Sequence, residues 1–305
     1  MDMGSDVTGD LESELLRSYL ALEAIDTNIY RASPVNLWHP PNGRFVYGGQ
    51  VIGQALIAAC RTVKEEQHVH SLHCYFLRGG NAKKPILYHV DRTRDGTTYS
   101  TRAIKATQES TPIFTMQASF KLEETDPLTH QYVMPVVPGP EELVESYDFL
   151  QTQLEAAEDE LSTEKREMIK RMLDHKLNID RRPVDPHLYH GMTQGEPKRY
   201  LWVRAQGNLG SDIKLHQCVA GFMCDMLLLG AALQPAVPGT KVGFMASLDH
   251  SMWFHNPFKA NEWMLYEIEC PQCGSGKALC TGRMWRKDGV LAVSMAQEGV
   301  VRSAL

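Results

Sequence analysis

One pattern occurs twice in this sequence: an apolar helix followed by several short segments of strand composition. The helices are predicted at 48–63 and 214–235, because apolar residues recur there at helical spacing. Turn-forming residues separate the segments after each helix. They predict antiparallel strands at 68–77, 84–94, 98–107 and 112–122, and again at 244–255, 262–270, 277–287 and 290–302. Such a chain is expected to form an α+β fold of two similar units.

Two landmarks support an internal duplication. Ser71-Leu72 precedes Ser247-Leu248 by 176 positions, and Gln117 precedes Gln297 by 180. Chance matches between two helix-and-strand units are the alternative explanation. At 305 residues the chain is long enough for two domains. We therefore divide it into an N-terminal unit at 1–134, a linker with a charged helical segment at 135–200, and a C-terminal unit at 201–305.

Composition argues against several classes of protein. A net charge of −6 provides no surplus of Lys and Arg for neutralising phosphates, so no nucleic acid partner is expected. Residues 1–16 are acidic and lack the pattern of a secretory or mitochondrial leader. The longest apolar stretch, 218–233, is short for a membrane span and contains Asp225. The seven cysteines are odd in number and lie mostly in apolar runs, which is typical of reduced intracellular thiols.

The stretch SLDHSMWFH at 247–255 contains the three residue types of a Ser-His-Asp hydrolase. Side chains alternate along a strand, so Ser247, Asp249 and Ser251 are predicted on one face and His250 on the other. Asp249 then cannot orient His250, as a catalytic triad requires. We predict instead a half-buried strand with His250 in the core.

No cofactor and no metal are predicted. Cys270 and Cys273 form a single C-x-x-C without a second pair, which favours incidental reduced thiols over a zinc or redox site. The glycines of GRFVYGGQVIGQ at 43–54 lack the spacing of a dinucleotide-binding loop, and close helix packing explains them. The start of that helix could still offer backbone N–H groups to an oxygen atom.

Two polar residues occupy apolar contexts. Asp225 lies among Met and Leu residues, where an ionised carboxylate needs partners. A general base and an exposed helix residue are both open interpretations of it. Gln297 shares the strand phase of Val293 and Met295, which predicts a buried amide. Gln117 in the first unit lies in the opposite, polar phase, so the two glutamines are not equivalent.

Longer motifs in this chain resemble the type II acyl-CoA thioesterases. They are GGQVIGQAL at 48–56, HSLHCYFLRGG at 70–80, LDHSMWFHNPF at 248–258, EWMLYE at 262–267 and DGVLAVSMAQEGVVR at 288–302. The resemblance extends over about residues 14 to 302, is interrupted in the linker, and is closer to the animal peroxisomal branch than to the bacterial enzymes. It implies a double hotdog, in which two long central helices are each wrapped by an antiparallel β-sheet within one chain.

The resemblance also implies a reaction and its residues. Asp225, Ser247 and Gln297 match the positions that hold and activate water in the family. Hydrolysis of fatty acyl-CoA thioesters to free fatty acid and coenzyme A, without an obligatory acyl-enzyme, is therefore expected. His70 matches a histidine proposed as auxiliary in the family. The acyl-CoA substrate needs basic contacts for its phosphates, and the conceivable ones are Arg78, Lys83, Lys84, Arg181 and Arg182.

The resemblance also bears on the location of the protein in the cell and on its assembly. The family implies peroxisomes and a role in fatty acid metabolism. Its peroxisomal members typically end in Ser-Lys-Leu, whereas this chain ends Ser303-Ala304-Leu305, which leaves the cytoplasm as the alternative. Assembly into homo-oligomers, as dimers or tetramers, is compatible with paired units. The alternative functions are hydration or dehydration of an acyl thioester on the same fold, and acyl-CoA binding without catalysis.

Overall fold

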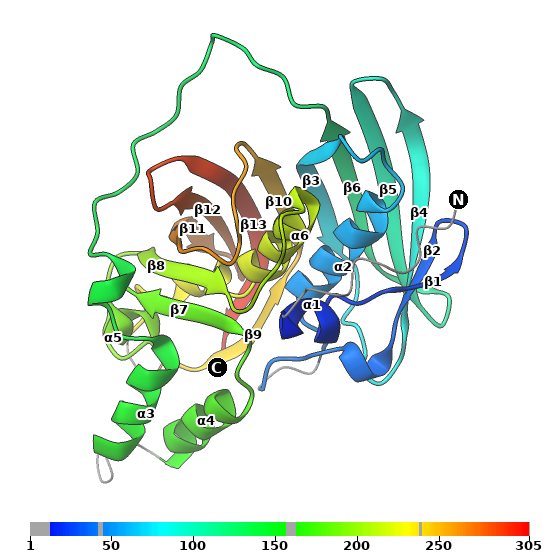
Figure 1. The fold of residues 1–305 in the computed structure, drawn as a ribbon. Helices are drawn as coiled ribbons and strands as arrows, with labels where there is room; N and C mark the ends of the chain where they lie inside the picture. Colours follow the sequence, from blue (N-terminus) through cyan, green and yellow to red (C-terminus); the bar gives the residue numbers. More distant parts are fainter. Residues whose placement is uncertain (1–12, 42–44, 157–162, 238–239, 305) are drawn as a thin grey trace.

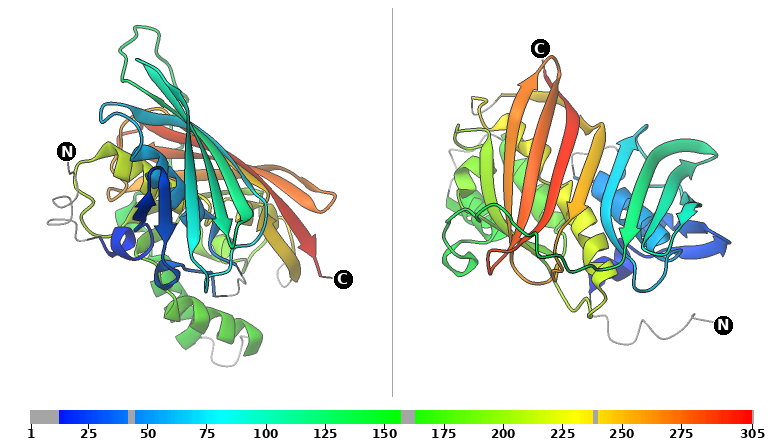
Figure 2. Two further views of the ribbon diagram at one scale, coloured as in Figure 1. Left: turned by 90° about the vertical axis from the view of Figure 1, so that its right-hand side faces the viewer. Right: turned by 90° about the horizontal axis from the view of Figure 1, so that it is seen from above.

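The computed structural model describes residues 13–41, 45–156, 163–237 and 240–304 (Figure 1). Most of the acidic N-terminal segment and the final residue of the C-terminal tripeptide therefore lie outside the described residues. The strands in the described part of the chain form one 13-stranded sheet, and the two long apolar helices lie side by side against it. Figure 2 shows the sheet curving around this helix pair.

The N-terminal unit has two short strands, then a helix, then four longer strands. Its central helix is α2 (Gly48–Cys60), which is buried along most of its length. The remaining elements are α1 (Glu14–Ser18), β1 (Glu23–Asp26), β2 (Ile29–Ala32), η1 (Pro34–Asn36), β3 (His68–Phe76), β4 (Ile86–Asp95), β5 (Tyr99–Gln108) and β6 (Thr111–Lys121).

The C-terminal unit has a similar order, with two strands before its central helix and five after it. Its central helix is α6 (Ile213–Cys224). The remaining elements are β7 (Ile179–Pro183), α5 (Pro186–Tyr189), β8 (Lys198–Ala205), η3 (Leu229–Leu233), β9 (Val242–Ser247), β10 (Asp249–Phe254), β11 (Met264–Gly274), β12 (Lys277–Arg286) and β13 (Leu291–Ser303). Between the units lie η2 (Pro140–Glu142), α3 (Ser146–Ala156) and α4 (Thr163–Asp174), and the last two project from the body of the molecule (Figure 1).

The order of strands within the sheet confirms the predicted pair of units. The units meet where β3 pairs with β10. From this junction outward, the N-terminal strands run β3, β6, β5, β4, β2, β1 and the C-terminal strands run β10, β13, β12, β11, β8, β7. The sequence patterns did not identify the two short strands that precede each helix. β7 lies before residue 201, β8 begins before it, and both pair with strands of the C-terminal unit, so we describe them with that unit. The division of the chain at residues 134 and 200 stays a prediction.

The second helix is shorter than predicted. It ends at Cys224 and is followed by a turn at 225–228 and then by η3, instead of continuing to 235. Two buried tyrosines take the last carbonyls of α6: Tyr47 Oη donates to Phe222 O at 2.6 Å, and Tyr266 Oη donates to Cys224 O at 2.8 Å. With these carbonyls satisfied, the chain leaves the helix at Asp225.

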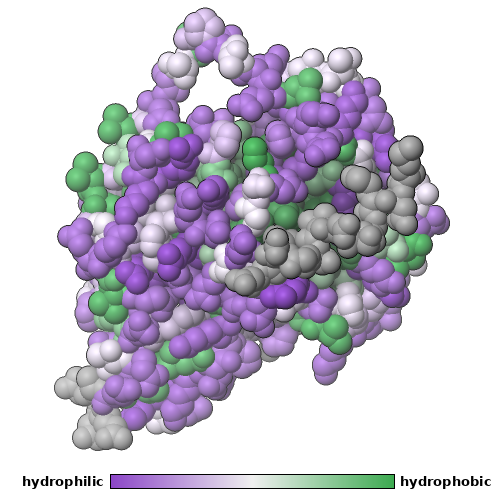
Figure 3. All heavy atoms as spheres, viewed as in Figure 1, coloured by the Kyte–Doolittle hydropathy of each residue, from purple (hydrophilic) through white to green (hydrophobic). Residues whose placement is uncertain are grey.

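The segment from α6 through η3 is apolar. By length and composition its 21 residues, Ile213–Leu233, could cross a membrane, but 78% of its most apolar window is buried inside the protein. Such burial is typical of a core helix. The face shown in Figure 3 is largely hydrophilic, with apolar residues in separate small groups.

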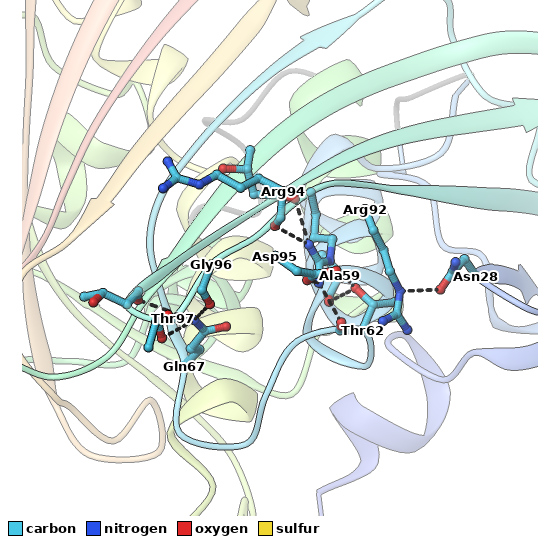
Figure 4. Close-up of polar contacts among 12 residues, drawn as sticks. Asn28, Ala59, Thr62, Gln67, Arg92, Arg94, Asp95, Gly96 and Thr97 are labelled. Atoms are coloured by element: carbon cyan, nitrogen blue, oxygen red, sulfur yellow. Dashed lines mark hydrogen bonds and ion pairs between the residues drawn. The ribbon is translucent and has the colours of Figure 1, made fainter.

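A buried arginine ties together the parts of the N-terminal unit. The Arg102 side chain is fully buried, and its guanidinium donates to Thr62 Oγ1, to the carbonyl of Thr62 and to the carbonyl of Arg94, each at 2.8 Å. Figure 4 shows that Thr62, Arg94 and Asp95 lie close together. The guanidinium also pairs with the Asp95 carboxylate. The charge is therefore compensated, and the β4–β5 hairpin is fixed to the end of α2.

Candidate active site

A one-residue bulge interrupts the predicted strand at 244–255 and divides it into β9 and β10. Ser251 pairs with Ala296 and Ser247 pairs with Gly299, so four steps on one strand oppose three on β13. A bulge shifts the alternation of side chains by one position. Strict alternation predicted Ser247 and His250 on opposite faces. That prediction was wrong, because the bulge turns both toward the helices.

The bulge brings together the three residues that the resemblance selected. Ser247 Oγ donates to Asp225 Oδ1 at 3.1 Å. Gln297 Nε2 donates to the same carboxylate oxygen at 2.5 Å and to Ser247 Oγ at 2.6 Å. Gln297 is fully buried, as its strand phase predicted, whereas Gln117 is exposed. Residues 72 positions apart in the sequence thus form one compact polar cluster.

The environment of Asp225 raises its pKa above the ordinary aspartate value. Burial is the main cause, and hydrogen bonds from Gln297, Ser247 and the backbone N–H of Gly49 oppose it. The other carboxylate oxygen, Oδ2, lies against the start of α2: a Cβ placed on Gly48 would be 2.7 Å from it. The positive end of that helix dipole favours a negative charge at this position.

Of three features that position the site, the sequence indicated the close packing at Gly49 and missed two tyrosines. Tyr47 and Tyr266 end α6 so that Asp225 leaves the helix toward Ser247. Gly49 allows α2 and α6 to approach, because a Cβ there would lie 2.4 Å from Phe222 O. The glycine pair in GRFVYGGQ was correctly associated with close packing, but nothing local to Tyr47 or Tyr266 indicates a partner so distant in sequence.

The structure confirms that Asp249 and His250 do not form a catalytic pair. Asp249 Oδ1 accepts a hydrogen bond from the Glu298 backbone N–H at 2.8 Å and so fills a gap in the strand pairing next to the bulge. His250 is fully buried, with Nε2 3.2 Å from Cys224 Sγ. Burial lowers the pKa of His250 to about 3, so its ring is neutral near pH 7.

His70 is placed apart from the three-residue cluster by its contacts. Its Nε2 lies 2.8 Å from Ser119 Oγ, and its ring packs edge-on against Tyr99, so both contacts are within the N-terminal unit. Burial lowers the pKa of His70, and the nearby charge of Lys121 adds to this effect. An auxiliary role for His70 stays a prediction.

The basic candidates do not form one patch. Lys84 is paired with Glu109, and Arg78 donates to Pro112 O, both in the N-terminal unit. Arg182 donates to Pro140 O and lies over the ring of Trp263, whereas Arg181 is buried. All seven cysteines are free thiols, with Cys270 buried and Cys273 exposed. Among the described residues no group of three or more His, Cys, Asp or Glu side chains is arranged to hold a metal ion.

Family models match both halves of the chain. The model described as "Acyl-CoA thioesterase N-terminal domain" matches residues 35–121, and the model described as "Acyl-CoA thioesterase" matches residues 172–300. The chain is 48% identical to acyl-coenzyme A thioesterase 8 of Rattus norvegicus over 98% of this chain and 92% of that protein.

Solved structures agree with the fold. An acyl-CoA thioesterase II from Mycobacterium marinum is 32% identical with a TM-score of 0.73, covering 95% of this chain and 97% of its own. A protein with a hot dog fold from Alicyclobacillus acidocaldarius, 13% identical, has a TM-score of 0.73 over 96% and 100% of the two chains. The fold is therefore a double hotdog, and the chain belongs to the acyl-CoA thioesterase family and is a thioester hydrolase.

Proposed function

We propose that Asp225 is the general base of acyl-CoA hydrolysis, and that Ser247 and Gln297 hold the water that it activates. The observation that carries this proposal is the direct contact of all three side chains around Asp225 Oδ1. A base must lie within hydrogen-bonding reach of the proton that it removes. A water bound at this cluster would meet that condition while facing the thioester carbonyl.

An unused acceptor supports a water at this position. Gln297 Oε1 is buried and has no hydrogen-bond partner, although Nε2 of the same amide makes two bonds. Buried polar atoms are seldom left unpaired in native proteins. A water that donates one hydrogen to Gln297 Oε1 and the other to Asp225 would satisfy both acceptors, and the Ser247 hydroxyl would hold the water oxygen by turning its hydrogen from Asp225 to the water. As Asp225 takes the second proton, the water oxygen would attack the thioester carbon and displace the coenzyme A thiolate.

The start of α2 would stabilise the negative charge that develops on the thioester oxygen. The first N–H groups of a helix have no partners within the helix. Gly48 is the first residue of α2 and lies beside Asp225 Oδ2, whereas the N–H of Gly49 already donates to Asp225, so Gly48 would be the donor to the oxyanion. Backbone N–H groups that are fixed before the reaction cost no reorganisation when the oxyanion forms. Ser247 serves as a hydroxyl that holds water, not as a nucleophile.

Release of thiol from a panel of acyl-CoAs tests this assignment. The Asp225→Ala variant should lose almost all turnover while the folded protein still binds substrate. An unchanged rate in that variant would remove Asp225 from the mechanism. The chain-length profile from the same panel would define the fatty acyl substrates and thereby test a role in fatty acid metabolism.

We also propose a peroxisomal location and assembly into homo-oligomers. The location is supported by the resemblance to the animal peroxisomal branch, and the uncharged Ala304 is the reason to test it directly. A fluorescent fusion that keeps residues 303–305 at its C-terminus should colocalise with a peroxisomal marker, and one lacking them should not. Sedimentation of the purified full chain would test assembly.

A further inference from the structure

Two arginines of the C-terminal unit are buried without a counter-ion. Arg181 on β7 and Arg199 on β8 are 6% and 8% exposed. Among the described residues no carboxylate lies within ion-pair distance of either guanidinium, and the Nε atom of each is buried without a hydrogen-bond partner. Arg102 shows the contrast, because its guanidinium is compensated by carbonyls, a hydroxyl and a carboxylate. An uncompensated buried charge is strongly destabilising.

The neighbours of this pair compensate its charge only in part: although burial opposes it, the surroundings of Arg181, which include Glu145, raise its pKa, whereas burial lowers the pKa of Arg199. Arg181 lies over the ring of Tyr147, with its centre 4.5 Å from the ring centroid, and Arg199 lies 5.4 Å from that of Tyr189. Aromatic faces attract a cation but do not neutralise it. Glu145 is the acidic side chain beside Arg181, but its oxygens accept from the backbone N–H groups of Arg181 and Tyr147.

Both guanidinium groups adjoin the segment that holds the catalytic carboxylate. Arg181 Nη1 lies 3.7 Å from Met226 Sδ, next to Asp225 in the chain. Arg199 packs on η3, where a Cβ on Gly230 would lie 2.2 Å from Nη2. His190 lies near both, and burial, then the charges of Arg181 and Arg199, lower its pKa to about 3. The fields of the two arginines therefore overlap at His190, and their guanidinium groups border the segment from Met226 to Gly230.

We propose that Arg181 and Arg199 form an oxyanion-binding subsite that receives an anionic group of the acyl-CoA substrate, either a phosphate of the coenzyme or a carboxylate at the far end of the acyl chain. Guanidinium groups suit both oxyanions, because their N–H donors match phosphate and carboxylate geometry. The proposal rests on the placement of the reaction at Asp225. An anion between the arginines would supply the missing charge and anchor the substrate beside the turn at 225–230.

Binding is tested first without turnover, by thermal unfolding of the full chain in inorganic phosphate and in chloride at equal ionic strength. Phosphate should raise the unfolding temperature of the native protein, and the shift should be lost in R181M and R199M. R182M is the matched control, since Arg182 is next in sequence and already bonded to Pro140 O, and it should respond like the native protein. An equal phosphate response in R181M, R199M and the native protein would overturn the subsite.

A second variant guards against misfolding of the arginine variants. G230A keeps both charges but places a Cβ where Arg199 now packs, so it should weaken the phosphate response. If G230A folds and responds fully, the position of Arg199 is irrelevant to binding and the proposal fails. D225N should keep the phosphate response while losing turnover, which separates failure of the subsite from failure of the catalytic assignment.

Steady-state kinetics then identify the source of the oxyanion. If the subsite binds a coenzyme phosphate, R199M should raise KM for acyl-CoA about tenfold or more with little change in kcat, and should not affect acyl-pantetheine, which lacks the phosphates. If it binds a distal carboxylate, the tenfold rise should be confined to acyl-CoAs that end in a carboxylate. An unchanged KM for every one of these substrates would exclude a substrate subsite.

Discussion

The two ends of the α2–α6 pair occupy corresponding places in the two units, yet within the described part of the chain the cluster of Asp225, Ser247 and Gln297 lies at one of them. At one end Asp225 follows α6 and meets the start of α2, Ser247 and Gln297. At the other end the chain leaves α2 through Arg61, which donates to Leu22 O and lies over the ring of Tyr30. In the first unit, the residues that correspond to Ser247 and Gln297 are Ser71 and Gln117. Two similar units thus provide two corresponding places, and a few residues decide which one holds the polar cluster that we propose as the active site.

Strand phase and the position of a bulge account for much of this difference. Gln297 and Gln117 lie on corresponding strands, but Gln297 is fully buried and Gln117 is exposed. In the second unit, the bulge between β9 and β10 lies after Ser247, whose side chain turns toward Asp225; in the first unit the register of β3 shifts before Ser71, between Val69 and Ser71. Shifting side chains by one position on a strand is enough to create or remove a polar site, because it exchanges the faces of the sheet.

The largest expected effect is at the helix ends. D225N should lower kcat/KM by about a thousandfold, within the range lost when a general base is removed. R61Q, at the corresponding end of α2, should leave kcat/KM within about twofold, because Arg61 contacts only a carbonyl and a tyrosine ring. Thiol-release assays on both variants check this, and comparable losses would show that the two ends are not functionally distinct.

Substitution of Gln297 and of Gln117 should affect kcat almost as differently as the substitutions at the two helix ends affect kcat/KM. Q297L should lower kcat by about a hundredfold, since it removes a water-holding amide and a hydrogen bond that favours ionised Asp225. Losing that bond should raise the pKa of Asp225, so the acidic limb of the pH–rate profile should move to higher pH. Q117L should match the native profile. An acidic limb that moves to lower pH in Q297L would contradict the assignment of Asp225 as the group that must be ionised.

His250, where the two units join, should affect stability instead of rate. Its folded pKa of about 3 lies below the ordinary value of 6.5, so protonation favours the unfolded chain. The resulting stability is present above pH 6.5 and is lost as the pH falls toward 3, by about 2 kcal/mol at pH 5. Urea unfolding of H250M between pH 7 and 4 should lack this loss. The same acid-induced loss in H250M would assign the effect to other groups.

Substitution of Ser247 and of Ser71 should give the smallest difference in turnover. S247A should lower kcat about tenfold, because Gln297 and Asp225 still hold the water in its absence. S71A should have no measurable effect on turnover. A loss in S247A as large as that in D225N would favour a nucleophilic serine over a hydroxyl that holds water.

The sequence predicted features set by local pattern and missed those set by distant contacts. The two helices, the strands after them and the burial of Gln297 follow from periodicity. Asp225 stood out because a carboxylate is costly among apolar residues. The turn of Ser247 toward the site depends on a bulge that local composition does not specify. The end of α6 depends on Tyr47 and Tyr266, which are distant in sequence.

In the proposed mechanism, water activated by Asp225 attacks the thioester directly. A single turnover in ¹⁸O-labelled water, followed by mass analysis of both product and protein, tests this most directly. Direct attack by water should give one ¹⁸O atom in the released fatty acid, no label in the Asp225 carboxylate and no acyl adduct on the protein at any time point. An acyl group trapped on Ser247, or ¹⁸O incorporated into Asp225, would contradict it.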